Sequence, residues 1–150
     1  MSSPTQIDPR GPRFGAVITS VLLAAVLILG PNSTLGLVIL LIQTVAFALG
    51  SLVGLHAQPW GLIFRTAIRP RLGAPTHLED VRPPRFAQAV GLGFALFGIL
   101  GWFVSPVLFY IAVGGALFAA LLNALFNFCL GCEIYLYIAR VRGRSAVGGA

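Results

Sequence analysis

Two cysteines, three residues apart, are the residues of this sequence best suited to chemistry. Cys129 and Cys132 are the only cysteines of the 150-residue chain and stand in the run Phe-Cys-Leu-Gly-Cys-Glu. A Cys-x-x-Cys spacing places two sulfurs within reach of each other, and a helix N-terminus or nearby cations stabilise the reactive thiolate. Glu133 follows the pair directly and could tune thiol protonation. The arginines that could supply a positive field are Arg82, Arg85 and Arg140.

Three interpretations of the cysteine pair are open. The first is redox or sulfur-transfer chemistry, in which the dithiol cycles with a disulfide and exchanges with a partner thiol. The second is metal binding, but zinc takes four ligands and only His56 and His77 remain to help, far from a standard spacing. The third is two small buried hydrophobic residues without chemistry. We favour the first and predict no metal site.

Polar side chains inside long apolar segments form a second set of candidates. Asn123 and Asn127 are the most polar residues deep in the last such segment, and Gln43 and Ser51 lie in an earlier one. Such groups can line a substrate path or hold a quinone headgroup, or they can form hydrogen bonds between helices. Because none of them is ionisable, we favour interhelical hydrogen bonding, and no motif supports a quinone.

The scarcity and placement of charge indicate a membrane protein. The chain has ten Arg, no Lys and four acidic residues, and its apolar set makes up 57%, whereas a soluble domain is about a quarter charged. No charge occurs between Arg13 and Arg65, over 51 residues, or between Arg85 and Glu133, over 47. Since roughly 20 helical residues cross a bilayer, each gap accommodates two crossings and a turn.

The sequence therefore predicts an all-α membrane protein, a single domain of four transmembrane helices arranged as two tandem helical hairpins. Turn-forming residues divide each gap, at residues 30–33 and at residues 105–106. A cleaved signal peptide is the alternative for the first span, but no small-x-small cleavage site follows it. The predicted spans cover about residues 14–30, 35–55, 86–104 and 107–129.

All ten arginines lie on one side of this predicted hairpin pair. They occur before the first span, in a central loop of residues 56–85 and in a basic tail of residues 139–150, whereas the two turns carry no charge. The positive-inside bias therefore predicts that both termini and the central loop are cytoplasmic. Because the cytoplasm is reducing, a static structural disulfide between the cysteines is disfavoured.

The two halves of the chain resemble each other at an offset of 72 residues. This offset predicts a parallel internal repeat with its pseudo-twofold axis along the membrane normal. Pro suits a first helical turn, Asp favours the positive end of the helix dipole, and Arg reaches lipid phosphates. We therefore predict that Arg10, Arg13, Arg82 and Arg85 anchor the chain at the membrane interface. The matching residues are Asp8, Arg10, Pro12, Arg13 and Phe14 with Asp80, Arg82, Pro84, Arg85 and Phe86.

The same offset aligns Gly131 with Pro59, and both residue types break helices. The segment after Pro59 is a candidate amphipathic surface helix, and residues 132–140 are its candidate counterpart. A kink at Gly131 would place Cys132 at a helix N-terminus. A straight helix would instead keep the thiols away from Asn123, and the sequence allows both.

Four motifs together resemble the uncharacterised bacterial membrane family called domain of unknown function 4395, over about residues 8–140. The resemblance implies a four-span bacterial membrane protein of a kind that is common in actinobacteria. It also implies an association with thioredoxin-like or rhodanese-like sulfurtransferase proteins. The motifs are Asp-Pro-Arg-Gly-Pro-Arg-Phe from Asp8, Arg-Pro-Arg-Leu-Gly-x-Pro-x-x-Leu-Glu-Asp from Arg69, Pro-Arg-Phe-Ala-Gln from Pro84, and Phe-Cys-Leu-Gly-Cys-Glu from Phe128.

The architecture is also similar to that of four-helix disulfide-forming enzymes of the quinone-linked and vitamin K epoxide reductase kinds. This chain departs from them because it has one cysteine pair in place of two, on the side predicted to be cytoplasmic. A disulfide-generating oxidase for exported proteins is therefore not expected.

These observations lead to one functional expectation and two alternatives. We expect a membrane protein that exchanges electrons or sulfur through Cys129 and Cys132 with a thioredoxin-like or rhodanese-like partner. The alternatives are a noncatalytic anchor or scaffold and a small-solute permease, so catalysis itself stays open. Membrane lipid is an expected partner. Nucleic acid is not, because the arginines sit beside apolar spans instead of forming a continuous basic face.

Overall fold

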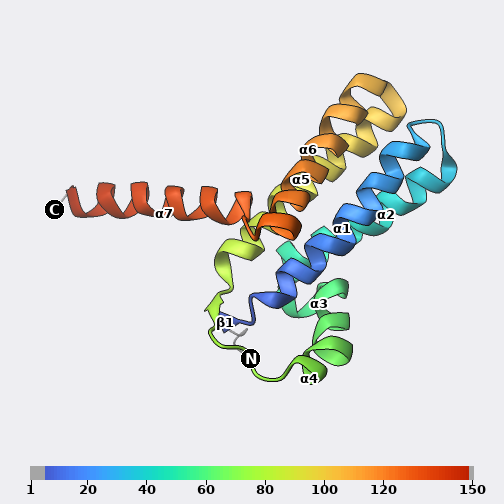
Figure 1. The fold of residues 1–150 in the computed structure, drawn as a ribbon. Coiled ribbons are helices and arrows are strands. Elements are labelled where there is room, and N and C mark those ends of the chain that lie inside the picture. The colour runs from blue at the N-terminus through green and yellow to red at the C-terminus, as the bar shows by residue number, and fades with distance from the viewer. Residues whose placement is uncertain (1–5, 149–150) are drawn as a thin grey trace.

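Helices make up almost the whole chain (Figure 1). The computed structural model describes the backbone of residues 6–148 and the side chains of residues 6–143. Among these residues, four helices are long and apolar enough to cross a membrane, which confirms the predicted all-α membrane class. They are α1 (Arg10–Leu29), α2 (Thr34–Ala48) with its π-helical continuation η1 (Leu49–Val53), α5 (Arg82–Val104) and α6 (Pro106–Phe126).

Short elements connect α2 to α5 at one end of the bundle, and two-residue strands pair there antiparallel, Gln6 opposite Asp80. The last helix, α7, leaves the bundle and projects sideways (Figure 1). The predicted basic tail lies within α7 as far as Gly148, and Gly149 and Ala150 lie outside the described residues. These elements are β1 (Gln6–Ile7), η2 (Leu55–Ala57), α3 (Pro59–Ile63), η3 (Phe64–Ile68), α4 (Arg69–Leu72), β2 (Glu79–Asp80) and α7 (Leu130–Gly148).

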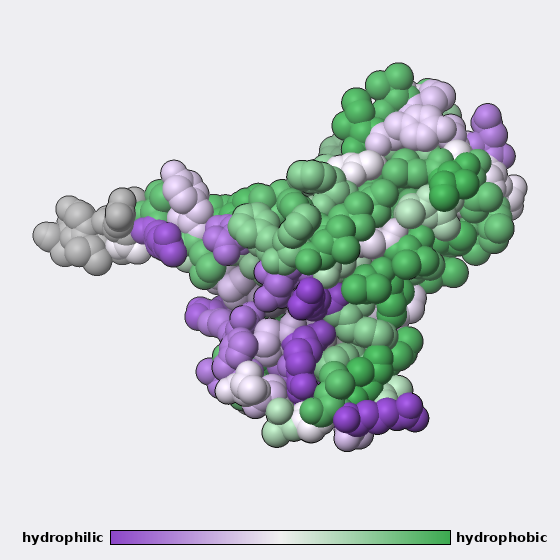
Figure 2. All heavy atoms as spheres, in the orientation of Figure 1, coloured by the Kyte–Doolittle hydropathy of each residue, from purple (hydrophilic) through white to green (hydrophobic). Residues whose placement is uncertain are grey.

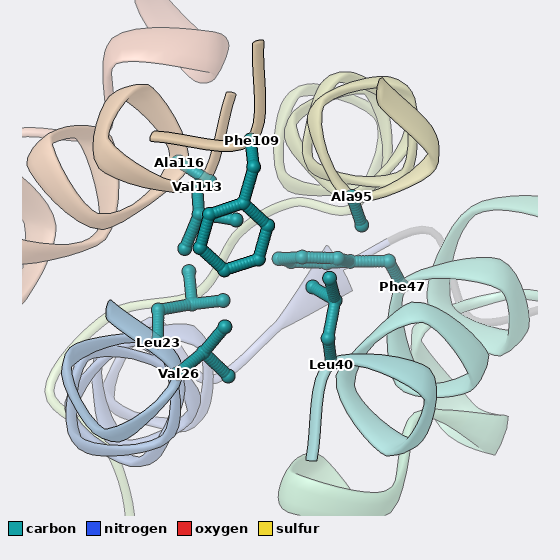
Figure 3. Close-up of a cluster of buried hydrophobic side chains, with 8 residues drawn as sticks. All are labelled: Leu23, Val26, Leu40, Phe47, Ala95, Phe109, Val113 and Ala116. Carbon is teal, nitrogen blue, oxygen red and sulfur yellow. The ribbon is translucent and has the colours of Figure 1, made fainter. Parts of the chain in front are cut away.

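The four long helices form a closed ring. α1 packs against α2 and α6, and α5 packs against the same two helices. Every helix of the ring contributes to one buried apolar cluster, in which the Phe47 and Phe109 rings extend toward the centre (Figure 3). The cluster consists of Leu23, Val26, Leu40, Phe47, Ala95, Phe109, Val113 and Ala116.

Small residues along α5 allow its neighbours to approach closely. A Cβ on Gly91 would lie 2.6 Å from the Phe47 ring of α2, and one on Gly98 would lie 3.0 Å from the Val113 side chain of α6. Gly101 faces backbone, since a Cβ there would lie 2.6 Å from the Cα of Phe109. In lipid, where helix association depends on packing, such small residues set the interhelical distance.

A serine caps the N-terminus of α2, and another caps the N-terminus of α6. The Ser33 hydroxyl accepts a hydrogen bond from the Gly36 N–H at 3.1 Å, and the Ser105 hydroxyl accepts one from the Leu108 N–H at 3.4 Å. Serine is favoured at this capping position because it satisfies an N–H that lacks a helical partner. Both turns lie where the sequence predicts them.

An identical Asp-x-Arg arrangement precedes α1 and α5. Asp8 accepts hydrogen bonds from the backbone N–H of Arg10 at 3.0 Å and from its guanidinium at 2.8 Å. Asp80 receives the same two bonds from Arg82, at 2.8 and 2.7 Å. In each case hydrogen bonds from the arginine side chain lower the pKa of the aspartate, so both carboxylates are ionised at neutral pH.

Two further arginines connect helices from different halves of the ring. The Arg13 Nε of α1 donates to the Ala124 carbonyl near the end of α6, at 3.3 Å. The Arg85 guanidinium of α5 donates to the Ser51 and Leu52 carbonyls at the end of η1, at 2.8 and 3.1 Å. Carbonyls in the last helical turn lack intrahelical partners, so each arginine satisfies the end of a helix in the other half.

Apolar side chains cover the outside of the long helices, whereas polar residues gather around the short elements and the start of α7 (Figure 2). Ile28, Ile111 and Phe126 are among the large apolar residues exposed on the long helices. A contiguous apolar surface of this extent is characteristic of a chain surrounded by lipid.

The close approach of α5 and α6 yields a stability prediction. We expect Gly101→Ala to lower stability by about 1–3 kcal/mol, because the new methyl overlaps the Phe109 backbone, which cannot move without separating the helices. Thermal unfolding of the purified protein in one detergent measures the effect. Gly93→Ala is the matched control in the same helix, because a Cβ there meets nothing within 4 Å. Equal unfolding temperatures for the two variants would contradict the proposed contact.

Candidate functional site

The cysteine pair follows a break between α6 and α7. Asn127 ends α6 in the left-handed conformation, with φ 54°, and its N–H donates to the Asn123 carbonyl at 3.1 Å. Asparagine is one of the few residues other than glycine that tolerate this conformation. The fourth span therefore ends at Phe126 and not at residue 129. The break lies at residues 127–129, before Gly131, the position at which the sequence left a kink open.

Cys129 directly precedes α7, and Cys132 lies in the first turn of that helix. The Cys129 carbonyl accepts a hydrogen bond from the Glu133 N–H at 3.0 Å, which is the first bond of the helix. The Cys129 Sγ accepts one from the Cys132 N–H at 3.3 Å. Cys129 thus occupies the capping position, whereas a kink at Gly131 would have put Cys132 at the helix start.

The two sulfurs form a disulfide, with 5.1 Å between the Cα atoms. Both residues are half-buried, so the disulfide is neither enclosed in the bundle nor fully exposed. The sequence disfavours a static structural disulfide, and the structure nevertheless joins the pair. A disulfide whose first sulfur accepts a helix N–H has a built-in stabiliser for the thiolate that reduction releases.

Gly131, between the cysteines, fixes the start of α7 against α5. A Cβ on Gly131 would lie 2.7 Å from both the Cα and the Cβ of Ala87. One turn further along, the Tyr135 ring packs against Phe86, with 5.7 Å between ring centroids. The glycine is therefore needed for close contact with α5, and this contact holds the disulfide beside the bundle.

A small cavity extends from the cysteine pair into the bundle. Its volume is about 90 Å³, roughly three water molecules. Cys129 and Asn123 both line it, together with Thr19 of α1 and Gln88 of α5. The break after α6 thus leaves Cys129 and Asn123 lining the same cavity. Asn127 is exposed and does not line it.

Gln88 is the functional candidate that sequence reasoning missed. Its Oε1 is buried and has no hydrogen-bond partner among the described residues. An unpaired buried amide oxygen is costly and marks a place where a bound group can bond. The sequence does contain a sign of it, because Gln88 is the one Gln or Asn between Phe86 and Val104, in an otherwise apolar segment.

The polar residues of the second span have structural partners. Gln43 is fully buried, and its Oε1 accepts a hydrogen bond from the Trp60 Nε1 of α3 at 3.2 Å. The Ser51 hydroxyl donates to the Phe47 carbonyl in its own helix at 2.8 Å. Hydrogen bonding to α3 therefore accounts for the Gln43 Oε1, whereas the Gln43 Nε2 is buried without a hydrogen-bond partner among the described residues.

The charged candidates are distributed around the site and do not converge on the sulfurs. Glu133 is exposed in the first turn of α7, and Arg140 is exposed further along that helix. Arg82 pairs with Asp80, and Arg85 bonds the end of η1. Within the described part of the chain, no three His, Cys, Asp or Glu side chains gather into a metal-ligand set. Lipid anchoring by the interfacial arginines stays a prediction.

Four apolar helices and a disulfide in the first turn of a fifth long helix define the class: an all-helical membrane protein with a Cys-x-x-Cys pair at the edge of its bundle. Residues 7–140 match the family described as Domain of unknown function (DUF4395). The chain belongs to this family, as its motifs indicate. No curated protein and no solved structure matches it.

The contact between Gly131 and Ala87 predicts how the disulfide is protected. We expect Gly131→Ala to speed reduction of the disulfide by dithiothreitol at least about fivefold, the factor that corresponds to 1 kcal/mol. The reason is that the added methyl displaces the first turn of α7 from α5. Gly143→Ala in the same helix is the control, since a Cβ there meets nothing within 4 Å. Unchanged reduction in Gly131→Ala would mean that α5 does not shield the sulfurs.

Proposed function

We propose that Cys129 and Cys132 exchange electrons or sulfur with a thioredoxin-like or rhodanese-like partner at the cytoplasmic face of a bacterial cell membrane. The observation that carries this proposal is the half-buried disulfide whose Cys129 sulfur accepts the Cys132 N–H at the start of α7. In the reducing cytoplasm a disulfide is usually a transient catalytic or sensing state. The disulfide is then one state of a cycle.

The electron-transfer step balances with a partner dithiol as the reductant. A partner thiolate attacks the Cys132 sulfur, the disulfide breaks, and Cys129 leaves as the thiolate that the helix N-terminus stabilises. The second partner thiol then attacks the mixed disulfide and releases Cys132. In total the pair gains two electrons and two protons, and the partner becomes a disulfide. Glu133, exposed beside the pair, is a candidate for the proton exchange with water.

Single-cysteine variants test the asymmetry of this step. In reduced protein we expect the Cys129 thiol of Cys132→Ser to be alkylated by iodoacetamide at pH 7 about tenfold faster than the Cys132 thiol of Cys129→Ser. The reason is that only Cys129 occupies the capping position. Mass spectrometry of samples quenched over time gives the rates, and guanidinium-unfolded protein supplies the control, in which the two rates converge.

The state of the pair in cells decides whether it reacts at all. Differential alkylation in intact cells treated with oxidant or reductant should show both the dithiol and the disulfide. A pair that stays in one state under both treatments, with serine variants that keep phenotype and partner crosslinks, rejects the redox function. A partner crosslink that survives loss of both cysteines would favour the anchor or scaffold, and solute uptake lost without thiol dependence would favour the permease.

We also propose that the chain is a parallel duplication with both termini and the central loop in the cytoplasm. Three recurrences at the 72-residue offset support this: the serine caps, the Asp-x-Arg arrangements, and the arginines bonded to Ala124 and Leu52. The uncharged turns at the opposite end of the helices support the orientation.

Reporter fusions test this topology. We expect alkaline phosphatase fused after Ala150 to be inactive and the same enzyme inserted at Asn32 to be active, because that enzyme requires an oxidising compartment to fold. A green fluorescent protein fusion after Ala150 is the complementary control and should fluoresce. An active phosphatase at the C-terminus would overturn the orientation and place the disulfide outside the cytoplasm.

A further inference from the structure

A second cavity, larger than the one at the cysteine pair, lies among the short elements. Its volume is about 250 Å³, close to that of eight water molecules. The N-terminal segment, the first turns of α1 and the segment from η2 to α4 enclose it, and α5 contributes Gln88. Pro12, Gly15 and Gln88 also line the cavity at Cys129, so a single layer of residues separates the two.

The charged walls of this cavity are not balanced. Asp8 is buried, but its carboxylate is already neutralised by three hydrogen bonds from the Arg10 guanidinium, the shortest at 2.8 Å. Arg69 lies farther away, with 3.8 Å between its Nε and the Asp8 Oδ2. Arg65 donates to the His56 carbonyl, an uncharged acceptor, at 2.7 Å. Two guanidiniums therefore contribute an excess of positive charge to the cavity.

The remaining walls combine amide groups with apolar side chains. Gln58 is buried, and its Oε1 caps α3 by accepting the Gly61 N–H at 2.7 Å. Phe64 is buried and forms part of the apolar wall with Leu55 and Leu78. Ligand sites usually have this character, mostly apolar with a few convergent polar groups that fix orientation. The Arg69 side chain is 43% exposed, so the charged side of the cavity is open to the surroundings.

We propose that this cavity binds an organic phosphate, with the phosphate on Arg65 and Arg69 and an apolar part against Phe64 and Leu78. A phosphate monoester carries a charge of about −1.5 to −2 and three strong acceptor oxygens, which matches two arginines. Guanidinium groups bind phosphate in paired hydrogen bonds that an ammonium cannot reproduce. The phosphate belongs either to a lipid headgroup at the membrane surface or to a soluble ester, and this site is independent of the thiol chemistry.

Binding of a soluble probe is the first arm of the test. Phenyl phosphate, titrated into the detergent-purified full chain, should raise its unfolding temperature, whereas benzyl alcohol should not. In the double variant Arg65→Gln with Arg69→Gln, we expect the affinity for phenyl phosphate to fall about tenfold or more, as for loss of charge-assisted hydrogen bonds. Arg71→Gln is the matched control, because Arg71 is exposed in the same segment and does not line the cavity.

Native mass spectrometry with phosphatidic acid, a lipid that carries a phosphate monoester, is the second arm. Lipid adducts that survive in the wild type and in Arg71→Gln but disappear in the double variant identify a lipid headgroup as the occupant. Dependence on the two arginines with phenyl phosphate alone identifies a soluble ester.

A cavity-filling variant tests the phosphate site independently if the double variant does not fold. Leu78→Trp leaves both arginines in place and should abolish phenyl phosphate binding by occupying the cavity. The proposal is overturned if neither probe distinguishes Arg71→Gln from the double variant, or if Leu78→Trp binds phenyl phosphate as the wild type does. Disulfide formation by the same preparations, checked by alkylation, separates this outcome from a failure of the thiol chemistry.

Discussion

The small-residue face of α5 is the constraint on which the bundle and the site both depend. Without a hydrophobic driving force between helices in lipid, association requires backbones to come close enough for dispersion contacts. Gly91, Gly98 and Gly101 provide this contact with α2 and α6, and Ala87 continues the same face toward α7. The face that closes the ring therefore also positions the disulfide.

The same constraint explains why the cysteine pair lies at the edge of the bundle. A disulfide deep among the spans would be out of reach of a protein partner, and one on a free loop would lack a fixed helix dipole. The left-handed Asn127 ends α6, and the contact of Gly131 with Ala87 directs the new helix sideways. Cys129 is half-buried and lines the small cavity that it shares with Asn123.

Much of the fold could be predicted because it follows from charge and turn chemistry. The two uncharged gaps determine four helices, and serine beside proline or asparagine marks the turns at Ser33 and Ser105. Whether the helix breaks near the cysteines stayed open in the sequence, because Gly131 is a residue type that breaks helices but also one that allows close helix contacts. Its backbone is helical, and the glycine serves a contact with a partner 44 positions earlier, at Ala87. A single sequence does not reveal which residue such a glycine faces.

The candidate site was predictable only in part, for a related reason. The cysteine spacing identifies the pair, but the cavity beside it combines Thr19, Gln88 and Asn123 from three helices. Likewise Arg65 and Asp8 are far apart in the chain, yet both line the larger cavity. Sequence separation does not predict which distant residues line the same cavity, because this depends on how the helices pack.

The bonds of Arg13 and Arg85 have a consequence for assembly. Each arginine lies in the first turn of a helix in one half and donates to carbonyls near the end of a helix in the other half. During synthesis the Ser51 and Leu52 carbonyls gain their Arg85 donor only after α5 has been made. Arg13 gains its Ala124 acceptor only after α6 has been made. Hydrogen bonds between helix starts and helix ends therefore connect the two halves. A chain cut in the central loop could regain its structure only by pairing both fragments.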